Sequence, residues 1–340
     1  MNLLELLKKL LGIAKIEQPI PVLPPEGPDT TPNFGKGCIP TPEIVKENQY
    51  VLAATPQPVI DWSVPFRIPA TLVQKNQNGS SSCTAQATDY YVQALNQIEH
   101  GTSELYSSRW IYSQSYIPPD GGAYIWKAMS IPIKLGVADL NSVPEGNSSE
   151  NIMRDASDNY KAILEAKTDK YAVISRQGQS IDFMAQVIKD YHGYVTGFNG
   201  YNDMFAPDGT VKDWSKVDWG HAVYICGYEL RNGVKCLVFK NSWGSSWGDG
   251  GYGYFPESFV NSGRMFDAYV YALIEDLDPK SIMLTAKHVR ELQALEGYRD
   301  ESGVAYWSGL SDGKPKVLAD YLAARLLDKI KTINESLVQE

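Results

Sequence analysis

The pattern of hydrophobic and polar positions changes character along the chain. In the first half, apolar positions recur at helical spacing, whereas later segments are short and rich in β-branched and aromatic residues. The predicted helices lie at about 83–95, 104–114, 123–134, 151–166 and 181–191. The predicted strands lie at 171–175, 194–198, 222–228, 235–239, 251–255 and 268–273. Helices first and strands afterwards indicate an α+β fold with two lobes and a cleft between them.

Both ends of the chain differ from this middle. Residues 1–15 place leucines on one helical face, which predicts an amphipathic helix, and residues 16–58 hold ten of the twenty prolines. After residue 277, helical patterns return at 278–295 and 315–337. We therefore expect an N-terminal amphipathic helix with a proline-rich extension, a globular domain, and a C-terminal helical extension. Their expected boundaries are 1–58, 59–277 and 278–340.

The proline-rich stretch cannot build a packed unit, because proline removes a backbone donor and favours extended chain. It is either a linker or a strap across the following domain, and we predict that it covers part of the cleft. The terminal helices are candidates for docking on a partner or on the protein's own surface. For the last helix, packing on the main domain is at least as well supported as a partner-binding seam.

Charge and composition exclude several classes of function. The net charge of -9 and the pI near 5.1 argue against nucleic-acid binding, which needs a basic face. No segment reaches the ~18 apolar residues of a membrane span, and the first fifteen residues lack the unbroken apolar run of a secretory signal. We expect a protein of the cytoplasm or another reducing compartment, with association to a particle as an alternative.

The four cysteines do not form a disulfide framework, and no Cys-x-x-Cys pair suggests zinc. Asn232-Gly233 predicts a two-residue hairpin turn in which Arg231 pairs with Val234. That register places Glu229 opposite Cys236 and Cys226 opposite Phe239, so the two sulfurs do not meet. We predict four free thiols. The four histidines show no helical ligand spacing, and we expect neither a metal nor a cofactor.

Three residues far apart in the sequence have complementary chemistry. Cys83 follows a Gly/Ser-rich turn and opens a predicted helix, where the partial positive charge of the helix end lowers a thiol pKa. His221 precedes a strand and Asn241 follows one. By residue type they supply a nucleophile, a base and an amide that orients the base. With an imidazolium nearby, we expect a thiolate near neutral pH.

The segment from Asn241 to Tyr252 resembles the papain family of cysteine peptidases. It reads Asn-Ser-Trp-Gly-Ser-Ser-Trp-Gly-Asp-Gly-Gly-Tyr and matches that family's Asn-Ser-Trp-Gly-x-x-Trp-Gly-x-x-Gly-Tyr motif at every defining position. The resemblance covers about 59–277. It implies a papain-like two-lobe fold, with a helical lobe and an antiparallel β-barrel-like lobe, and a polypeptide substrate.

The resemblance also implies roles for particular residues. Cys83 would attack the peptide carbonyl, His221 would protonate the leaving amine and activate water, and Asn241 would orient His221. Gln77, six residues before Cys83, would share the oxyanion with the Cys83 backbone N–H. The residues implied around the substrate and the catalytic pair are Gly121, Gly122, Val195, Gly220 and Trp243.

The chain departs from the family pattern around the nucleophile. Many relatives read Cys-Gly-Ser-Cys-Trp where this chain has Ser80 to Thr84, and Pro119 stands at the usual disulfide partner position. Both ends of that bridge are absent together, which fits a reducing compartment. We therefore carry three hypotheses: a cysteine endopeptidase, a papain-fold structural or assembly protein with little proteolysis, and a transamidase that uses the same nucleophile.

Overall fold

The computed structural model describes residues 37–42, 45, 59–101, 103–146, 171–175 and 180–272, all of which belong to one compact unit. The statements below refer to these residues. The predicted helices at 1–15, 151–166, 278–295 and 315–337 lie outside them, as does most of the proline-rich stretch. The expected domain boundaries stay predictions.

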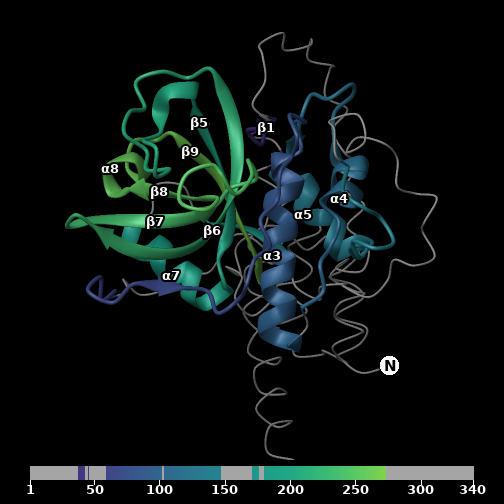
Figure 1. The fold of residues 1–340 in the computed structure, drawn as a ribbon, viewed down its shortest axis with the longest axis horizontal. Helices are drawn as coiled ribbons and strands as arrows, with labels where there is room; N and C mark the ends of the chain where they lie inside the picture. Colours follow the sequence, from purple (N-terminus) through teal and green to yellow (C-terminus); the bar gives the residue numbers. More distant parts are fainter. Residues whose placement is uncertain are drawn as a thin grey trace, which may run out of the picture. The chain divides into compact units, whose positions relative to one another are not determined.

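Three helices form one lobe. They are α3 (Cys83–His100), α4 (Ser108–Ser115) and α5 (Ile125–Lys134), preceded in the case of α5 by the short strand β3 (Ala123–Tyr124). Figure 1 shows them gathered on one side of the strands, with α3 alongside the sheet. The first thirteen residues of α3 are buried, and Gly101 ends the helix in the left-handed conformation. The helix is thus a central element rather than a surface one.

The second lobe is an antiparallel sheet of seven strands in the order β4-β9-β5-β6-β7-β8, with β2 paired to β6. Its strands are β2 (Phe66–Arg67), β4 (Tyr171–Ser175), β5 (Tyr194–Gly200), β6 (Trp219–Arg231), β7 (Val234–Lys240), β8 (Tyr252–Pro256) and β9 (Met265–Ala272). The helices of this half of the chain are α7 (Ile181–Tyr191), α8 (Glu257–Val260) and the 3-10 turn η2 (Asn202–Met204). The described strands do not close into a barrel. The α+β class and the two-lobe arrangement are confirmed.

The elements differ from their sequence predictions mainly at the ends. The helix predicted at 181–191 has those bounds, whereas the one predicted from 104 begins at Ser108, where Ser107 accepts a hydrogen bond from Trp110 N. Ala123 and Tyr124 form a strand rather than a first helical turn. The partner of that strand is β1 (Cys38–Ile39), which comes from the proline-rich extension and has no local apolar pattern that predicts a strand.

The hairpin prediction was right at its turn and wrong at Cys226. Arg231 pairs with Val234 and Glu229 with Cys236, as expected. A bulge between Ile225 and Gly227 then shifts the register, so Ile225 rather than Cys226 lies opposite Phe239. All four cysteines are free thiols, which confirms that prediction.

Candidate active site

Cys83 lies at the first position of α3, beneath a tight turn. Asn78 and Gly79 both have positive φ angles, and Ser80 N donates to Gln77 O at 2.9 Å. Asn and Gly are the two residues that adopt the left-handed backbone conformation at the lowest energetic cost. The turn feeds directly into the helix, and the Cys83 side chain is 0% exposed.

His221 and Asn241 meet at one end of the sheet. His221 lies near the start of β6, and Asn241 follows β7, which pairs with β6. His221 Nε2 is 2.9 Å from Asn241 Oδ1, and both side chains are buried. This contact fixes the ring orientation and leaves Nδ1 as the nitrogen for proton exchange with a thiol.

The two lobes meet at the nucleophile. The backbone N–H of Ala222, the residue after His221, interacts with the Cys83 sulfur. The start of α3 therefore lies against the start of β6, and the two elements pack on each other. The structure thus brings Cys83, His221 and Asn241 to one place.

Burial raises the pKa of the Cys83 thiol to about 12, against the lowering effect of backbone hydrogen bonds from Ala222, Thr84, Cys83 itself and Gly37. Burial therefore works against the expected thiolate in this form of the protein. The helix N-terminus does supply donors, but complete removal of the sulfur from water penalises the anion more. One of the donors, Gly37, belongs to the N-terminal extension, so the extension lies against the sulfur.

Gln77 is tied to the loop that carries Asn241. Gln77 N donates to Ser242 O at 2.9 Å, and Ser242 Oγ donates to Gln77 Oε1 at 2.6 Å. Gln77 Nε2 also donates to Ser80 O at 2.7 Å. An amide nitrogen carries two N–H groups, so one remains for the predicted oxyanion role. That role stays a prediction.

An aromatic cluster surrounds the imidazole. The Trp243 ring stacks on His221 with centroids 4.4 Å apart and an interplanar angle of 29°. Phe198 meets the same imidazole edge-on, at 5.6 Å and 87°. Trp243 was predicted, but Phe198 was missed. Phe198 lies opposite His221 because of the register in which β5 pairs with β6. Local sequence patterns do not predict that register.

The described part of the extension lies beside Cys83. Strand β1 (Cys38–Ile39) pairs with β3 in parallel, and Ala123 N donates to Gly37 O at 2.8 Å. On the other side, Gly37 N donates to Gly220 O at 3.1 Å. Residues 37–39 therefore bridge β3 and β6. That the extension covers a substrate cleft stays a prediction.

The backbones at this crossing are in close contact. A Cβ on Gly37 would lie 2.4 Å from Ser81 O, and one on Gly220 would lie 2.2 Å from Cys38 O. A Cβ on Gly122, which has φ +81°, would lie 2.0 Å from Gly37 O. Gly122 and Gly220, both predicted to bind substrate, thus contact the protein's own chain here.

Two other predicted substrate-binding residues take less direct positions. Gly121 N donates to Ile117 O at 2.7 Å and so closes the turn before Gly122. Val195 is buried in β5, opposite Tyr224. The β5 residue opposite Ala222 is Gly197, and Phe266 fills the space beside it. The roles of Gly121 and Val195 stay predictions.

A polar clamp joins the two loops that a disulfide would connect in many relatives. Ser81 N lies 3.2 Å from each carboxylate oxygen of Asp120, and Tyr112 OH donates to Asp120 Oδ1 at 2.5 Å. Burial raises the pKa of Asp120, against the effect of these donors. The link between the loops is therefore kept, with hydrogen bonds to a carboxylate in place of a covalent bond.

Across the described residues, no His, Cys, Asp or Glu side chains group as three metal ligands. In the same part of the chain, no helix combines the length and the apolar character that crossing a membrane requires.

Comparisons with known proteins agree on one family. Residues 58–273 match the family model described as papain family cysteine protease. A thiol protease from Hemerocallis is 24% identical over 219 residues, which are 59% of this chain and 54% of that protein. Papain from Carica papaya is 27% identical over 52% of this chain and 49% of its own length. The chain thus spans about half the length of these two relatives.

Solved structures show the same fold. Xylellain, a cysteine protease from Xylella fastidiosa, superposes with a TM-score of 0.57 at 22% identity, over 73% of this chain and 99% of its own. Bromelain from Ananas comosus superposes with a TM-score of 0.51 at 21% identity, over 64% of this chain and 100% of its own.

Proposed function

Because the chain belongs to the papain family of cysteine proteases, we propose that it is an endopeptidase that hydrolyses peptide bonds through a thioester on Cys83. The observation that carries the proposal is the His221 Nε2 contact with Asn241 Oδ1 at 2.9 Å, with Cys83 against the adjacent Ala222. An oriented base beside a buried thiol at a helix start is the arrangement that acyl transfer needs.

The proposed reaction has two steps. Once the strap has left, Cys83 gives its thiol proton to His221 Nδ1, and the resulting thiolate attacks the peptide carbonyl carbon. The carbon–nitrogen bond then breaks as His221 Nδ1 passes that proton to the leaving amine. Water, deprotonated by His221, then attacks the thioester and releases the acid and the thiol. The Cys83 N–H and the Gln77 amide would stabilise the oxyanion in both steps, and each such donor contributes about 3 kcal/mol.

Covalent labelling tests the assignment of the nucleophile. Full-length protein is treated with an epoxide thiol inhibitor, mapped by mass spectrometry, and incubated with a peptide pool. We expect the label on Cys83, no label in Cys83→Ala, and loss of peptide cleavage in that variant. Cys226→Ala is the matched control, because Cys226 is also a buried free thiol, but inside β6. Cleavage that persists in Cys83→Ala would overturn the proposal.

The same experiment separates the other two hypotheses. A folded protein that neither labels nor cleaves, even with the extension displaced, would favour an assembly role. Products whose masses include an added amine would favour transamidation. No contact among the described residues favours either one.

We further propose that residues 37–42, the strap, keep the enzyme latent. Thr41 N donates to the buried Asp267 carboxylate, and Thr41 Oγ1 lies 3.0 Å from Tyr269 OH. Together with the contacts of Gly37, these anchor the strap on β9, β6 and β3. A substrate backbone would need the same Gly122 and Gly220 groups, so the strap must leave before a substrate binds.

A further inference from the structure

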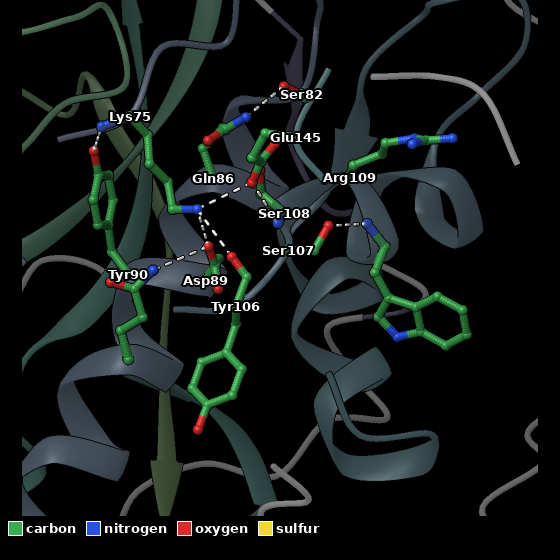
Figure 2. Close-up of polar contacts among 12 residues, drawn as sticks. Lys75, Ser82, Gln86, Asp89, Tyr90, Tyr106, Ser107, Ser108, Arg109 and Glu145 are labelled. Carbon is green, nitrogen blue, oxygen red and sulfur yellow. Dashed lines mark hydrogen bonds and ion pairs between the residues drawn. The ribbon is translucent and has the colours of Figure 1, made fainter. Parts of the chain in front are cut away.

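A lysine and two carboxylates lie together inside the helical lobe, outside the proposed catalytic residues. Lys75 Nζ forms an ion pair with Asp89 on α3 and another with Glu145 Oε1 at 3.0 Å, and it donates to Tyr106 O at 3.2 Å. Figure 2 shows these groups converging on the ammonium. The Lys75 side chain is 8% exposed and that of Asp89 is 0%. Removing such charges from water costs free energy of folding, and apolar residues of similar size often stabilise a core at least as much as a buried ion pair.

The backbone of Lys75 faces the proposed catalytic residues. Lys75 N donates to Tyr90 Oη at 2.7 Å, and that hydroxyl donates to Asn241 O at 3.2 Å. Lys75 O accepts from Gly244 N at 3.1 Å. One residue therefore has its side chain in the ion cluster and its carbonyl on the turn that carries Asn241, and its N–H is linked to that turn through the Tyr90 hydroxyl.

The neighbours of Lys75 continue this contact. Gln74 Nε2 donates to Asn241 O at 2.7 Å and to Lys75 O at 2.8 Å. Two residues after Lys75, Gln77 N donates to Ser242 O at 2.9 Å. The segment 74–77 thus lies along the loop 241–244. The ion pair between Lys75 and Asp89 links this segment to α3 in the helical lobe.

We propose that Lys75 is a positioning residue for the peptidase reaction: its buried ion pair with Asp89 fixes the segment 74–77, which in turn holds Asn241 and Gln77 in line with Cys83. The inference rests on the proposed function for its kinetic consequences. Its geometric consequence, the position of Asn241 against His221, does not depend on turnover.

The cluster changes charge near neutral pH. The groups that face Asp89 are the Lys75 ammonium, the Glu145 carboxylate and the Gln93 amide. Burial raises the pKa of Asp89 to about 7, against the pull of Lys75. Burial also opposes the charge on Lys75, but the two carboxylates outweigh it and raise the pKa of Lys75.

The sign of the pH effect separates positioning from stability. Since the folded-state pKa of Asp89 lies above its ordinary value, the folded protein binds more protons than the unfolded chain between about pH 4 and 7. The Asp89 contribution to stability therefore falls as pH rises through that window. In the folded protein Asp89 ionises around pH 7, so its ion pair with Lys75 forms between about pH 6 and 8, and the positioning contribution to turnover rises there. A merely structural role would make both fall together.

The test compares Lys75→Met and Asp89→Asn with Ile188→Ala, a buried control in α7 on the other lobe. We measure kcat, KM and the melting temperature of full-length protein from pH 5 to 9. We expect Lys75→Met to lower kcat at least about 10-fold with KM within about twofold, a difference of about 1.4 kcal/mol in the barrier. In Asp89→Asn the ratio of variant to wild-type kcat should change between pH 6 and 8. Lys75→Arg, which keeps the charge, should recover part of the loss.

A second readout does not need activity. The imidazole ¹H–¹⁵N NMR signals of His221 report its contact with Asn241, and we expect them to shift in Lys75→Met and Asp89→Asn but not in Ile188→Ala. If nothing is cleaved even by Gly37→Val, a variant that weakens the strap, the proposed function fails while this measurement still decides the inference. Unshifted signals would overturn the inference, as would a kcat loss no larger than in Ile188→Ala at equal stability. If Lys75→Met does not fold, the near-isosteric Asp89→Asn carries the same test.

Discussion

His221 and Cys83 meet at the cleft, yet different kinds of contact hold them. His221 sits on a strand, with Trp243 stacked on one face, Phe198 at its edge and Asn241 at Nε2. Cys83 follows a polar turn that is tied by Asp120 and crossed by Gly37. The histidine side is a cluster of aromatic rings around the hydrogen bond between His221 and Asn241, whereas the cysteine side is a set of loop contacts that includes the protein's own extension.

The difference indicates where this chain has diverged. The histidine side keeps the residues of the Asn241 to Tyr252 motif, because stacked rings and a buried amide tolerate few replacements. The cysteine side keeps Cys83 and Gln77 but changes what surrounds them. We therefore expect substitutions on the histidine side to lower activity, and substitutions in the strap to raise it.

The largest effect is expected for Asn241→Ala. The substitution removes the acceptor at 2.9 Å from His221 Nε2 and leaves the ring free to rotate about its stack on Trp243. Hydrogen bonds to charged groups contribute about 1.5–3 kcal/mol, so kcat should fall by about 100-fold. Kinetics on a peptide substrate measure this.

Asn202→Ala is the matched control for that change. It removes another amide acceptor from the same lobe, 3.1 Å from Trp219 Nε1, without touching His221. An equal loss of kcat in both variants would show that the lobe as a whole, rather than the orientation of His221, had been disturbed.

The next largest effect is an increase in activity. Gly37→Val adds a side chain where even a Cβ would lie 2.4 Å from Ser81 O, and it leaves the protease domain unchanged. Loss of about 1.4 kcal/mol of strap binding would raise the rate of inhibitor labelling at Cys83 about 10-fold. Mass spectrometry of the labelled protein follows the rate.

Thr41→Val gives a graded comparison within the strap. It keeps the N–H that binds Asp267 and removes the hydroxyl near Tyr269, so labelling should rise by less than in Gly37→Val. An unchanged labelling rate in a folded Gly37→Val protein would refute latency and leave the strap a structural contact.

The sequence predicted one side of the site better than the other. The motif around Asn241 and Trp243 fixed the histidine side, because its contacts are made by residues close together in the chain or on paired strands. The contacts that Gly37 and Asp120 make could not be predicted from the motif, because no local periodicity indicates contacts between loops or with a proline-rich segment. The bulge at Cys226 was missed for a related reason: a single extra residue in a strand leaves the apolar pattern almost unchanged.

The pH dependence of thiol reactivity sharpens the comparison further. Burial raises the pKa of Cys83 to about 12 under the strap, so alkylation of the wild type should still be accelerating at pH 10. In Gly37→Val, water reaches the sulfur and the pKa should fall. Because the covered thiol binds its proton more tightly than the open one, closure is favoured at low pH and weakens as pH rises towards the covered-state pKa. Identical alkylation profiles in the two proteins would contradict this.

The smallest effect concerns the polar clamp. Asp120→Asn replaces a charged acceptor of the Ser81 N–H and the Tyr112 hydroxyl with a neutral amide, and the difference between charged and neutral hydrogen bonds is about 1 kcal/mol. The melting temperature should fall by a few degrees, and more than in Tyr112→Phe, which removes one donor and leaves the link to Ser81. If both variants melt like the wild type, Asp120 does not replace the missing bridge, and the cysteine side is held by the strap and the turn alone. A lower melting temperature in Asp120→Asn alone would show that the hydrogen bonds between Asp120 and Ser81 stabilise the contact between the two loops. That contribution would be smaller than the about 2–4 kcal/mol of a typical disulfide.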